Sequence, residues 1–381
     1  MKKPKICFIT AAEITVKVFL VNHLKALSKQ YEISVVTNTN NADFLKTVGL
    51  HLNIIPLRIE RAISPIRDLN ALFRLIVLFR KCRFKAVHSV TPKAGLLSML
   101  AAFFVLIPVR IHTFTGQVWV NRKDVVRWCF KIADRVLACC ATHILVDSLS
   151  QREFLIKEKV VSESKSYVIA NGSICGVDTK RFAPNSEGRK KLRERFSLLE
   201  SDIVFLFLGR LTVDKGLLDL AHAFAEVSAI REESHIILVG PDEENMKEKI
   251  LAICRGCEAR VHFEGLTNTP EEFMAGADVF CLPSYREGFG MAIIEAASAG
   301  MPAIGTDIYG VTDAIEKGVT GLLYPPGDAH MLAQAMLQMI ENPTGRNAMG
   351  EQARERVIRL FSQEKVTSSF VAFYESLLPP G

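Results

Sequence analysis

The chain has 381 residues, of which 49% are apolar and 23% are charged, a balance typical of globular proteins rather than disordered or fibrous ones. This length exceeds what one ordinary hydrophobic core accommodates, and it predicts two domains of similar size. Residues 94–109 form the longest apolar stretch, which is shorter than the roughly 20 residues of a membrane-spanning helix. We therefore expect no transmembrane segment, and the basic N-terminus lacks the pattern of a signal peptide.

Positive charge is concentrated in the first half of the chain. Residues 1–175 contain 26 Lys and Arg against 11 Asp and Glu, whereas residues 176–381 contain 21 against 30. The halves carry +15 and −9, which together give the net charge of +6. This asymmetry favours an anionic partner for the first half, either nucleic acid or an acidic membrane surface, and the alternative is a solvated basic surface. We expect no nucleic acid, because aromatic stacking residues are not interleaved with the basic ones.

Nine cysteines without a secretory signal predict reduced thiols and a cytoplasmic protein. Cys254 and Cys257 form one CxxC motif, but no second pair and no nearby histidine ligands accompany it. Because a structural zinc site needs four ligands, we interpret this motif as structural and expect no metal.

Short apolar runs alternate with helical patterns through the first half. Strands are expected at residues 5–10, 33–37, 51–55, 86–90, 109–114, 144–146 and 167–169. Helices are expected at residues 14–29, 66–82, 93–106 and 125–140. This alternation is typical of βαβ units and of a mainly parallel sheet.

The second half repeats the alternation. Strands are expected at residues 204–208, 235–239, 261–263, 279–282, 302–305 and 321–324, and helices at 216–230, 243–254, 271–276 and 290–300. The predicted fold class is therefore α/β, with two doubly wound, Rossmann-like domains facing across a cleft. The domains span residues 1–175 and 176–381, and their join lies near residues 171–184. Three helices at 328–341, 346–360 and 363–378 close the chain, and they can pack back on the first domain.

Residues 282–296 carry the strongest site signal. A strand ends there and a helix begins near Gly290, so free N–H groups and the positive end of a helix dipole favour a phosphate or a sugar oxygen. Gly288 and Gly290 lack a Cβ and let the backbone approach a ligand closely. Glu287 and Glu295 are eight residues apart, so both can face one pocket. The alternative is a pair of solvated surface carboxylates.

A second loop, residues 209–216, follows the first strand of the second half and opens a helix. Arg210 and Lys215 in this loop can meet a diphosphate, Arg through its planar fork and Lys as a point charge. The alternative is a surface ion pair with Asp214. The position at the carboxyl end of a strand, beside a helix start, favours ligand binding.

The strand ends of the first half carry weaker signals. Residues 10–13, Thr-Ala-Ala-Glu, lack every glycine of a dinucleotide-binding fingerprint, so we expect no NAD site there. His112 ends a strand among hydroxyl side chains, where it can hydrogen-bond a sugar or assist proton movement. A lone histidine is more often a satisfied structural residue, and His88 is the weaker candidate of the two.

Residues 65–85 predict a basic amphipathic helix. Such a helix can lie on an anionic bilayer, and the alternative is a core-packed helix with charged ends. Its cations are Arg67, Arg74, Arg80, Lys81, Arg83 and Lys85. The basic surface is extended by Lys93, Arg110, Arg122, Lys123 and Arg127.

Together these motifs resemble the retaining glycosyltransferases of family 4, which have the two-domain GT-B fold. Glu287-Gly-Phe-Gly-x4-Glu295 resembles the family's Glu-x7-Glu signature. Further matches over residues 200–345 are Gly209-Arg210…Lys215-Gly216, Phe263-Glu-Gly265, Ala277-Asp278…Pro283-Ser284 and Gly318-x-x-Gly321-Leu-Leu-x-Pro325. In the first half, residues 88–96 and 112–116 resemble segments of the bacterial family members that build capsule, O-antigen and lipid-linked glycans.

The resemblance implies transfer of a sugar from a nucleotide donor, UDP-linked by family habit, with retention and without a metal or other cofactor. Arg210 and Lys215 would neutralise the leaving diphosphate. Glu287 would contact hydroxyls of the donor sugar without becoming covalently bound, and Glu295 would hold the ribose. Backbone groups would complete the donor site: Gly288, Phe289, Gly290 and Met291 at sugar and phosphate, and Gly265 and Leu266 at the base.

On the acceptor side, the resemblance places His112 by the reacting centre, with further contacts from Thr113, Lys93, Ala12 and Glu13. Many family members carry Gly-Gly after the first strand, where this chain has Ala11-Ala12. Because of this departure, the resemblance does not extend to donor contacts from that loop, and whether the loop contacts the donor is left open.

The expected function is a cytoplasmic glycosyltransferase, peripheral on the inner face of the plasma membrane, that extends a polyprenyl-diphosphate-linked saccharide. The basic first half would recognise the acceptor's diphosphate and the bilayer surface. Two enzymatic alternatives are a GT-B enzyme with a soluble acceptor and a sugar-nucleotide epimerase. A scaffold that lost catalysis is disfavoured, because it has no need of all four of Arg210, Lys215, Glu287 and Glu295.

Overall fold

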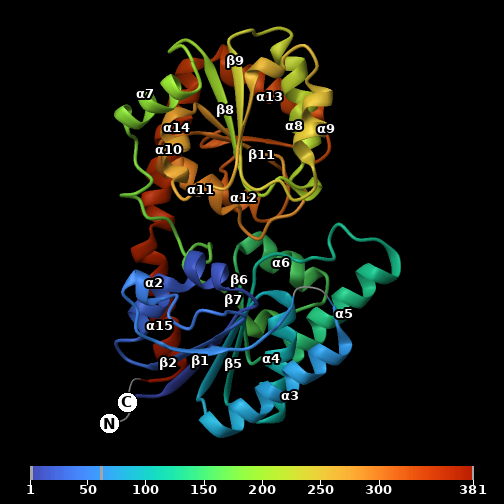
Figure 1. The fold of residues 1–381 in the computed structure, drawn as a ribbon, viewed down its shortest axis with the longest axis vertical. Coiled ribbons are helices and arrows are strands. Elements are labelled where there is room, and N and C mark those ends of the chain that lie inside the picture. Colours follow the sequence, from blue (N-terminus) through green and yellow to red (C-terminus); the bar gives the residue numbers. More distant parts are fainter. Residues whose placement is uncertain (1–2, 61–62, 380–381) are drawn as a thin grey trace. The chain divides into compact units, whose positions relative to one another are not determined.

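The structure, a computed structural model, describes residues 3–60 and 63–379 of the chain. It forms two compact units, Met1–Gly176 together with Gln363–Gly381, and Val177–Ser362. Within each unit a parallel sheet is flanked by helices on both faces (Figure 1). The predicted α/β class with two Rossmann-like domains is confirmed.

The sheet of the first unit has its strands in the order β3-β2-β1-β4-β5-β6-β7, and every neighbouring pair is parallel. The strands are β1 (Lys5–Ile9), β2 (Glu32–Thr37), β3 (Asn53–Pro56), β4 (Ala86–Val90), β5 (Val109–Phe114), β6 (His143–Val146) and β7 (Ser166–Val168). Strand order reverses between β1 and β4. In open parallel sheets, ligands bind beyond the carboxyl ends of the strands at such a reversal.

Most helices of the first unit lie between its strands along the chain, whereas α15 comes from the end of the chain. They are α1 (Glu13–Thr15), α2 (Val21–Leu27), α3 (Pro65–Cys82), α4 (Pro92–Phe104), α5 (Asp124–Cys140), α6 (Leu149–Lys157) and α15 (Gln363–Leu377). A π-helical turn, Val16–Leu20, separates α1 from α2. Short 3-10 turns occur at Lys46–Val48 and Glu163–Lys165.

Alternate side chains of β1 enter two apolar clusters on opposite faces of this sheet, as the period of two of a strand requires. Cys7 and Ile9 pack with α3, α4 and α5, whereas Ile6 and Phe8 pack with α2 and α15. Tyr374 of α15 reaches the sheet, where its hydroxyl lies 2.6 Å from Nδ1 of His88. The last helix of the chain is therefore part of the core of the first unit.

The sheet of the second unit has the parallel order β10-β9-β8-β11-β12-β13, with the reversal between β8 and β11. Its strands are β8 (Ile203–Leu208), β9 (Ser234–Val239), β10 (Val261–Glu264), β11 (Val279–Leu282), β12 (Ala303–Thr306) and β13 (Gly321–Tyr324). Its helices are α7 (Ser186–Arg195), α8 (Leu217–Ser228), α9 (Met246–Ile253), α10 (Pro270–Gly276), α11 (Met291–Ser298), α12 (Val311–Ala314), α13 (Ala329–Glu341) and α14 (Pro343–Phe361). Short 3-10 turns occur at Val213–Lys215 and Glu258–Arg260.

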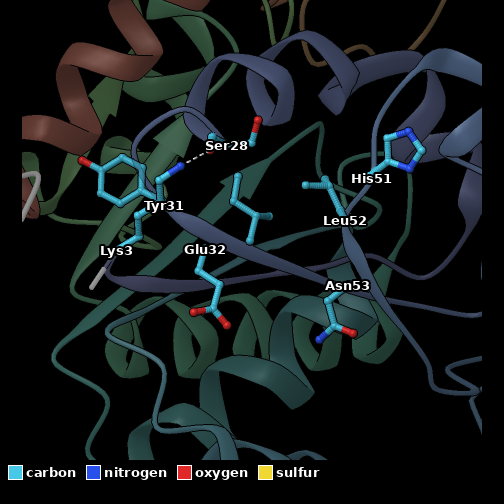
Figure 2. A pocket seen from close by; sticks show the side chains of 8 residues that line it. Lys3, Ser28, Tyr31, Glu32, His51, Leu52 and Asn53 are labelled. Atoms are coloured by element: carbon cyan, nitrogen blue, oxygen red, sulfur yellow. Dashed lines mark hydrogen bonds between the residues drawn. The ribbon is translucent and has the colours of Figure 1, made fainter. Parts of the chain in front are cut away.

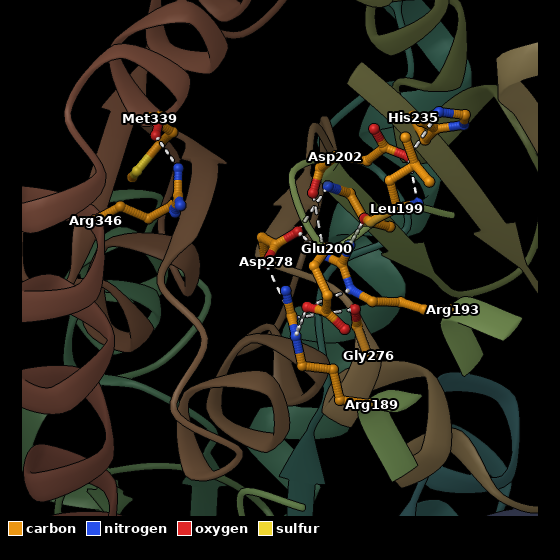
Figure 3. A network of polar contacts seen from close by, with 11 residues as sticks. Arg189, Arg193, Leu199, Glu200, Asp202, His235, Gly276, Asp278, Met339 and Arg346 are labelled. Atoms are coloured by element: carbon orange, nitrogen blue, oxygen red, sulfur yellow. Dashed lines mark hydrogen bonds and ion pairs between the residues drawn. The ribbon is translucent and has the colours of Figure 1, made fainter. Parts of the chain in front are cut away.

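Asp278, directly before β11, joins α7 to the amino ends of the central strands (Figure 3). Its Oδ2 lies 2.8 Å from Nη2 of Arg193 and accepts the N–H of Val204 at 2.8 Å, while its Oδ1 lies 3.0 Å from Nη1 of Arg189. The Arg193 side chain is only 2% exposed, so its charge needs this internal partner. Asp278 is thus structural, at the sheet edge opposite the carboxyl ends.

Every strand expected from the sequence is present, with ends shifted by at most two residues, but helices α6, α7 and α12 were not expected. Helix α7 reads SEGRKKLRER and offers no apolar repeat; its start is fixed by Asn185, whose Oδ1 accepts the N–H of Gly188 at 3.0 Å. The continuous helix expected over residues 14–29 is broken by the π-helical turn, which the apolar period does not reveal.

Candidate active site

Two loops of the second unit meet where its strand order reverses. Residues 209–216 follow β8 and residues 283–290 follow β11. Gly216 has a φ of +69°, and a Cβ there would lie 1.9 Å from the carbonyl oxygen of Pro283. The two loops therefore pack directly against each other, at the edge where ligands of parallel sheets bind.

This packing brings Lys215 and Glu287 together. Nζ of Lys215 lies 2.5 Å from Oε1 of Glu287, and the two side chains are 20% and 14% exposed. The backbone supports the contact, because the N–H of Tyr285 donates to the carbonyl oxygen of Asp214 at 3.0 Å. A cation and a carboxylate predicted from two separate motifs thus share one place, with little water between them to screen their charges.

Arg210 has a partner that the sequence did not indicate. Its Nη1 lies 2.8 Å from Oε2 of Glu243, and Asp214, the alternative partner, is instead 3.3 Å from Nη2 of Arg286. The Arg210 and Glu243 side chains are 49% and 41% exposed, and such surface pairs contribute only about 0–1 kcal/mol. The guanidinium can therefore exchange Glu243 for a ligand phosphate at little cost.

The glycine-containing loop before α11 is shaped by close backbone contacts. Gly290 caps α11 with a φ of +74°, and a Cβ at Gly310 would lie 2.6 Å from the carbonyl oxygen of Gly288. The Phe289 ring is 2% exposed and meets Phe361 edge to face at 5.2 Å. Of the residues predicted to contact the donor here, Phe289 can therefore offer only its backbone, while its ring anchors the loop.

Glu295 lies on α11, about one helical turn after Met291. Its side chain is half-buried, and no hydrogen bond joins its carboxylate to another described residue. Burial raises the pKa of Glu295 to about 7, with an opposing effect from Arg181 and a further increase from Glu271. A half-buried carboxyl group with unused oxygens can accept ribose hydroxyls.

Sequence reasoning missed the two residues that act on the charge of Glu295. Arg181 precedes α7 and Glu271 lies in the first turn of α10, and their side chains pair at 2.7 Å. No local motif marks either residue, because only the fold brings their segments to α11.

Gly265 and Leu266, predicted to contact the base, directly follow β10. The N–H of Gly240 donates to the carbonyl oxygen of Glu264 at 3.0 Å, which fixes the end of the strand. A Cβ added at Gly265 would meet nothing within 4 Å, and Leu266 is 80% exposed. The backbone here is accessible to a ligand.

His112, in the first unit, is 1% exposed near the end of β5. Its Nδ1 lies 2.9 Å from Oγ of Ser89, whereas its buried Nε2 has no hydrogen-bond partner among the described residues. A Cβ at Gly95 would lie 2.4 Å from Cε1 of His112, so this glycine on α4 makes room for the ring. Burial lowers the pKa of His112 to about 3, and the neutral ring has one nitrogen available to a ligand.

Two neighbours of His112, His88 and Thr113, contact each other in the interior. His88 is fully buried, with Nδ1 2.6 Å from the Tyr374 hydroxyl and Nε2 2.7 Å from Oγ1 of Thr113. Both ring nitrogens of His88, the weaker candidate of the two, are thus engaged in the interior. The Thr113 hydroxyl is engaged with His88, and its contact with an acceptor stays a prediction.

The remaining residues predicted on the acceptor side follow β1 and β4, the strands at the reversal. Nζ of Lys93 lies 2.6 Å from Oδ1 of Asp68, and both side chains are mostly buried. Glu13 lies 3.3 Å from Nζ of Lys17, and Ala12 has extended backbone directly before α1. The two charged groups therefore have partners inside the first unit.

A cavity of about 440 Å³ lies at the amino ends of β2 and β3 (Figure 2). It is lined by Lys3, Ser28, Tyr31, Glu32, Ile33, His51, Leu52 and Asn53. None of the residues predicted for the site lines it, and it is at the amino rather than the carboxyl edge of the sheet. It is therefore not the candidate active site.

Two further sequence expectations concern metals and membrane spans. Within residues 3–60 and 63–379, no group of three or more His, Cys, Asp or Glu side chains is placed to hold a metal ion. Cys254 and Cys257 are buried, and the thiol of Cys257 donates to the carbonyl oxygen of Cys254 at 3.2 Å. Among the helices in the described part of the chain, none has the length and apolar character needed to cross a bilayer.

Comparison with known protein families matches both units. The model for glycosyl transferases group 1 matches residues 188–356, and the model for glycosyltransferase family 4 matches residues 16–181. The chain belongs to glycosyltransferase family 4. The resemblance, the GT-B fold and the enzyme class expected from the sequence are thus confirmed.

This glycosyltransferase is 29% identical over 328 residues to the capsular polysaccharide biosynthesis glycosyltransferase CapM of Staphylococcus aureus, covering 86% of this chain and 85% of the relative. It is 28% identical to the UDP-Gal:alpha-D-GlcNAc-diphosphoundecaprenol alpha-1,3-galactosyltransferase of Escherichia coli, covering 79% of this chain and 78% of the relative. Its fold is similar to that of HepE of Anabaena in complex with UDP and glucose, with a TM-score of 0.82 and 19% identity. The match covers 98% of this chain and 100% of the HepE chain.

Proposed function

We propose that this glycosyltransferase moves a sugar from a UDP-linked donor to a polyprenyl-diphosphate-linked saccharide, with retention and without a metal, in surface polysaccharide synthesis. The contact of Lys215 with Glu287 at the strand reversal, with Arg210 on the same loop, carries the proposal. The names of the relatives support the substrates: the E. coli relative is named for a UDP-galactose donor and a diphosphoundecaprenol-linked acceptor, and CapM for capsular polysaccharide.

The donor diphosphate would take over the two cations of the second unit. The Lys215 ammonium would contact a donor phosphate as well as Glu287, and the Arg210 guanidinium would exchange its exposed pairing with Glu243 for a pairing with a phosphate. Glu287 would then accept hydroxyls of the donor sugar, while Glu295 holds the ribose and the backbone at Gly265 meets the base. Lys215, which is mostly buried, and the more exposed Arg210 would stabilise the charge that develops on the departing UDP.

Retention would follow from attack on the face that UDP leaves. The bond between the donor-sugar C1 and the phosphate oxygen breaks, and a bond from C1 to the acceptor oxygen forms. The acceptor's proton passes to the departing phosphate oxygen, so no group of the protein needs to become covalently attached. Glu287 orients the donor sugar in this scheme, and His112 offers its neutral Nε2 to the acceptor.

The first unit would meet the acceptor and the bilayer. Helix α3 has one packed apolar stripe, and a second, exposed stripe runs along another side. The exposed side chains are Ile66, Leu69, Phe73 and Val77, at 86%, 68%, 65% and 48%. With Arg74, Arg80 and Lys81 on the same helix, this stripe fits an anionic membrane surface. We accordingly propose a peripheral enzyme on the cytoplasmic face of the plasma membrane.

A screen of nucleotides and nucleotide sugars by thermal shift, followed by transfer assays with the best binder, tests the reaction. The acceptor is farnesyl-diphosphate-linked N-acetylglucosamine in detergent. We expect stabilisation by UDP and by at least one UDP-sugar, and transfer that continues in excess EDTA with retention at C1. Stabilisation by no nucleotide would refute the proposed function, and loss of transfer in EDTA would refute metal independence.

Flotation with liposomes tests the membrane contact. The wild type should float with phosphatidylglycerol vesicles at low salt and less at high salt, because anionic lipids attract the basic helix. Phe73→Glu should abolish flotation, whereas Leu199→Glu, which changes a residue of the second unit with similar exposure (68%), should not. Unchanged flotation of Phe73→Glu would contradict the assignment of α3.

A further inference from the structure

Three adjacent strands of the first unit end beside buried polar atoms that have no hydrogen-bond partner among the described residues. They are Oγ1 of Thr91 after β4, Nε2 of His112 in β5, and Oδ1 of Asp147 after β6. His112 and Asp147 are 1% and 6% exposed. Such atoms are rare in proteins, because an unpaired buried polar group costs about 1–3 kcal/mol, so a cluster of them points to a ligand.

The strand register brings these three residues to one edge of the sheet. Ser89 is paired with His112, and Val146 with Phe114, so Thr91 and Asp147 begin the loops on either side of β5. Neighbouring strands are about 4.8 Å apart, so the backbones at the ends of β4 and β6 lie roughly 10 Å apart. This is the carboxyl edge, and β4 is also one of the two strands at the reversal of strand order.

Backbone strain accompanies the unpaired atoms. Thr91 has a φ of +82°, an outlier for a β-branched residue, and although it precedes α4 its side chain makes no capping hydrogen bond. Ala170 and Ser173 also have positive φ values, of 51° and 73°, and the N–H of Ser173 donates to the carbonyl oxygen of Asp147 at 2.7 Å. Strain of about 1–3 kcal/mol per residue persists where the surroundings hold it, and it clusters at ligand sites.

All three unpaired groups are uncharged at neutral pH. Burial lowers the pKa of His112 to about 3 and raises the pKa of Asp147 to about 8. A protonated Asp147, a threonine hydroxyl and a neutral imidazole can each donate or accept a hydrogen bond. Neutral groups of this kind suit the hydroxyl and amide groups of a sugar, whereas a diphosphate would favour cations.

We propose that Thr91 and Asp147, together with His112, bind the sugar of the acceptor to which the donor sugar is transferred. The proposal rests on the proposed function, since it assigns the saccharide part of that acceptor to these strand ends. Thr91 and Asp147 are then specificity-determining residues: each would recognise a hydroxyl or acetamido group, and an acceptor sugar lacking that group would leave the buried atom unpaired.

Paired variants separate recognition from folding. Thr91→Val removes the hydroxyl and keeps the β-branched shape, whereas Thr91→Ser keeps the hydroxyl. Asp147→Leu removes both oxygens, whereas Asp147→Asn keeps a neutral donor and acceptor. Because Oγ1 of Thr91 and Oδ1 of Asp147 have no hydrogen-bond partner among the described residues, Thr91→Val and Asp147→Leu should melt at the wild-type temperature or above, and a purely structural role would instead lower it.

Saturation-transfer NMR with the methyl α-glycosides of N-acetylglucosamine, glucose and galactose measures sugar binding without any transfer. The wild type, Thr91→Ser and Asp147→Asn should give a signal with at least one glycoside, and Thr91→Val and Asp147→Leu should lose it. In transfer assays the latter two should raise the acceptor KM at least about tenfold, with the donor KM and UDP-induced stabilisation unchanged.

Two results would overturn the proposal: no glycoside signal in the wild type, or signals and acceptor KM values that Thr91→Val and Asp147→Leu leave unchanged. Failure of the proposed function is distinct from these results. A wild type that binds a glycoside through these residues but transfers no sugar would refute the reaction and leave the sugar site standing.

Discussion

The variant Lys215→Met tests the centre of the candidate active site, because it removes the ammonium while keeping a flexible side chain of similar length. In the wild type this ammonium lies 2.5 Å from Glu287, whose side chain is 14% exposed. Removing one partner of a fully buried pair costs about 3–5 kcal/mol, and partial exposure reduces this to about 1–3 kcal/mol. For a unit of this size the melting temperature should fall by about 2–12 °C.

The catalytic loss should exceed the loss of stability. A preorganised group that stabilises developing negative charge contributes about 10²–10³-fold to kcat, or roughly 3–4 kcal/mol of transition-state stabilisation. The double variant Lys215→Met/Glu287→Gln should recover most of the lost melting temperature, since the unpaired carboxylate is gone. It should not recover transfer, because the cation that meets the phosphate is still absent.

Transfer kinetics and thermal unfolding measure both effects on the same preparations. Lys190→Gln is the matched control, because Lys190 is a 70% exposed lysine on α7 of the same unit and pairs with the exposed Glu194 one turn away. It should keep the wild-type kcat. If Lys215→Met retained kcat to within about threefold, Lys215 would not stabilise the leaving group, and the reasoning from this contact would be refuted.

Three further predictions concern the same unit. Glu287→Gln should lower kcat strongly without accumulating a glycosyl-enzyme, and a sugar covalently attached to Glu287 in mass spectra of the wild type would reverse this view. Because burial raises the pKa of Glu295 from 4.5 to about 7, the folded state binds its proton more tightly than the unfolded state does. The stability contributed by this group is therefore lost as pH rises from about 4.5 to 7. The stability of Glu295→Gln relative to wild type should increase over that range. Urea titrations at several pH values that show no such trend would contradict the assignment. Gly216→Ala should destabilise the unit, because its Cβ would lie 1.9 Å from the Pro283 carbonyl oxygen at a φ of +69°, and an unchanged melting temperature would show that the two loops can separate freely.

Strands were the features best predicted from the sequence, because an apolar run bounded by Gly, Pro or polar residues is a local property. Helices without an apolar repeat were not predicted from the sequence. In α6, Leu155 is the fully buried apolar residue, and the helix is capped by Ser148, whose Oγ accepts the N–H of Gln151 at 3.1 Å. A single capping serine in a polar segment is too common to identify a helix from sequence alone.

The candidate site divides in the same way. The Gly288 and Gly290 loop, Lys215 and Glu287 were found from local motifs, since a strand end, glycines and a helix start are visible in the chain itself. The partner of Arg210 was not, because Glu243 reaches it from another loop, and an exposed arginine has several carboxylates within range. Arg181 and Glu271 next to Glu295 were missed for the same reason.

The alternation of strands and helices, the two parallel sheets and the residue types at the ends of their central strands follow from the local order of residues. Tertiary packing sets which side chains meet, such as Lys215 with Glu287 across 72 residues of chain and His88 with Tyr374 across 286. It also sets which buried atoms stay unpaired, such as those of Thr91, His112 and Asp147. Periodicity and turn chemistry act over a few residues, whereas burial and hydrogen-bond satisfaction depend on every segment packed around a group.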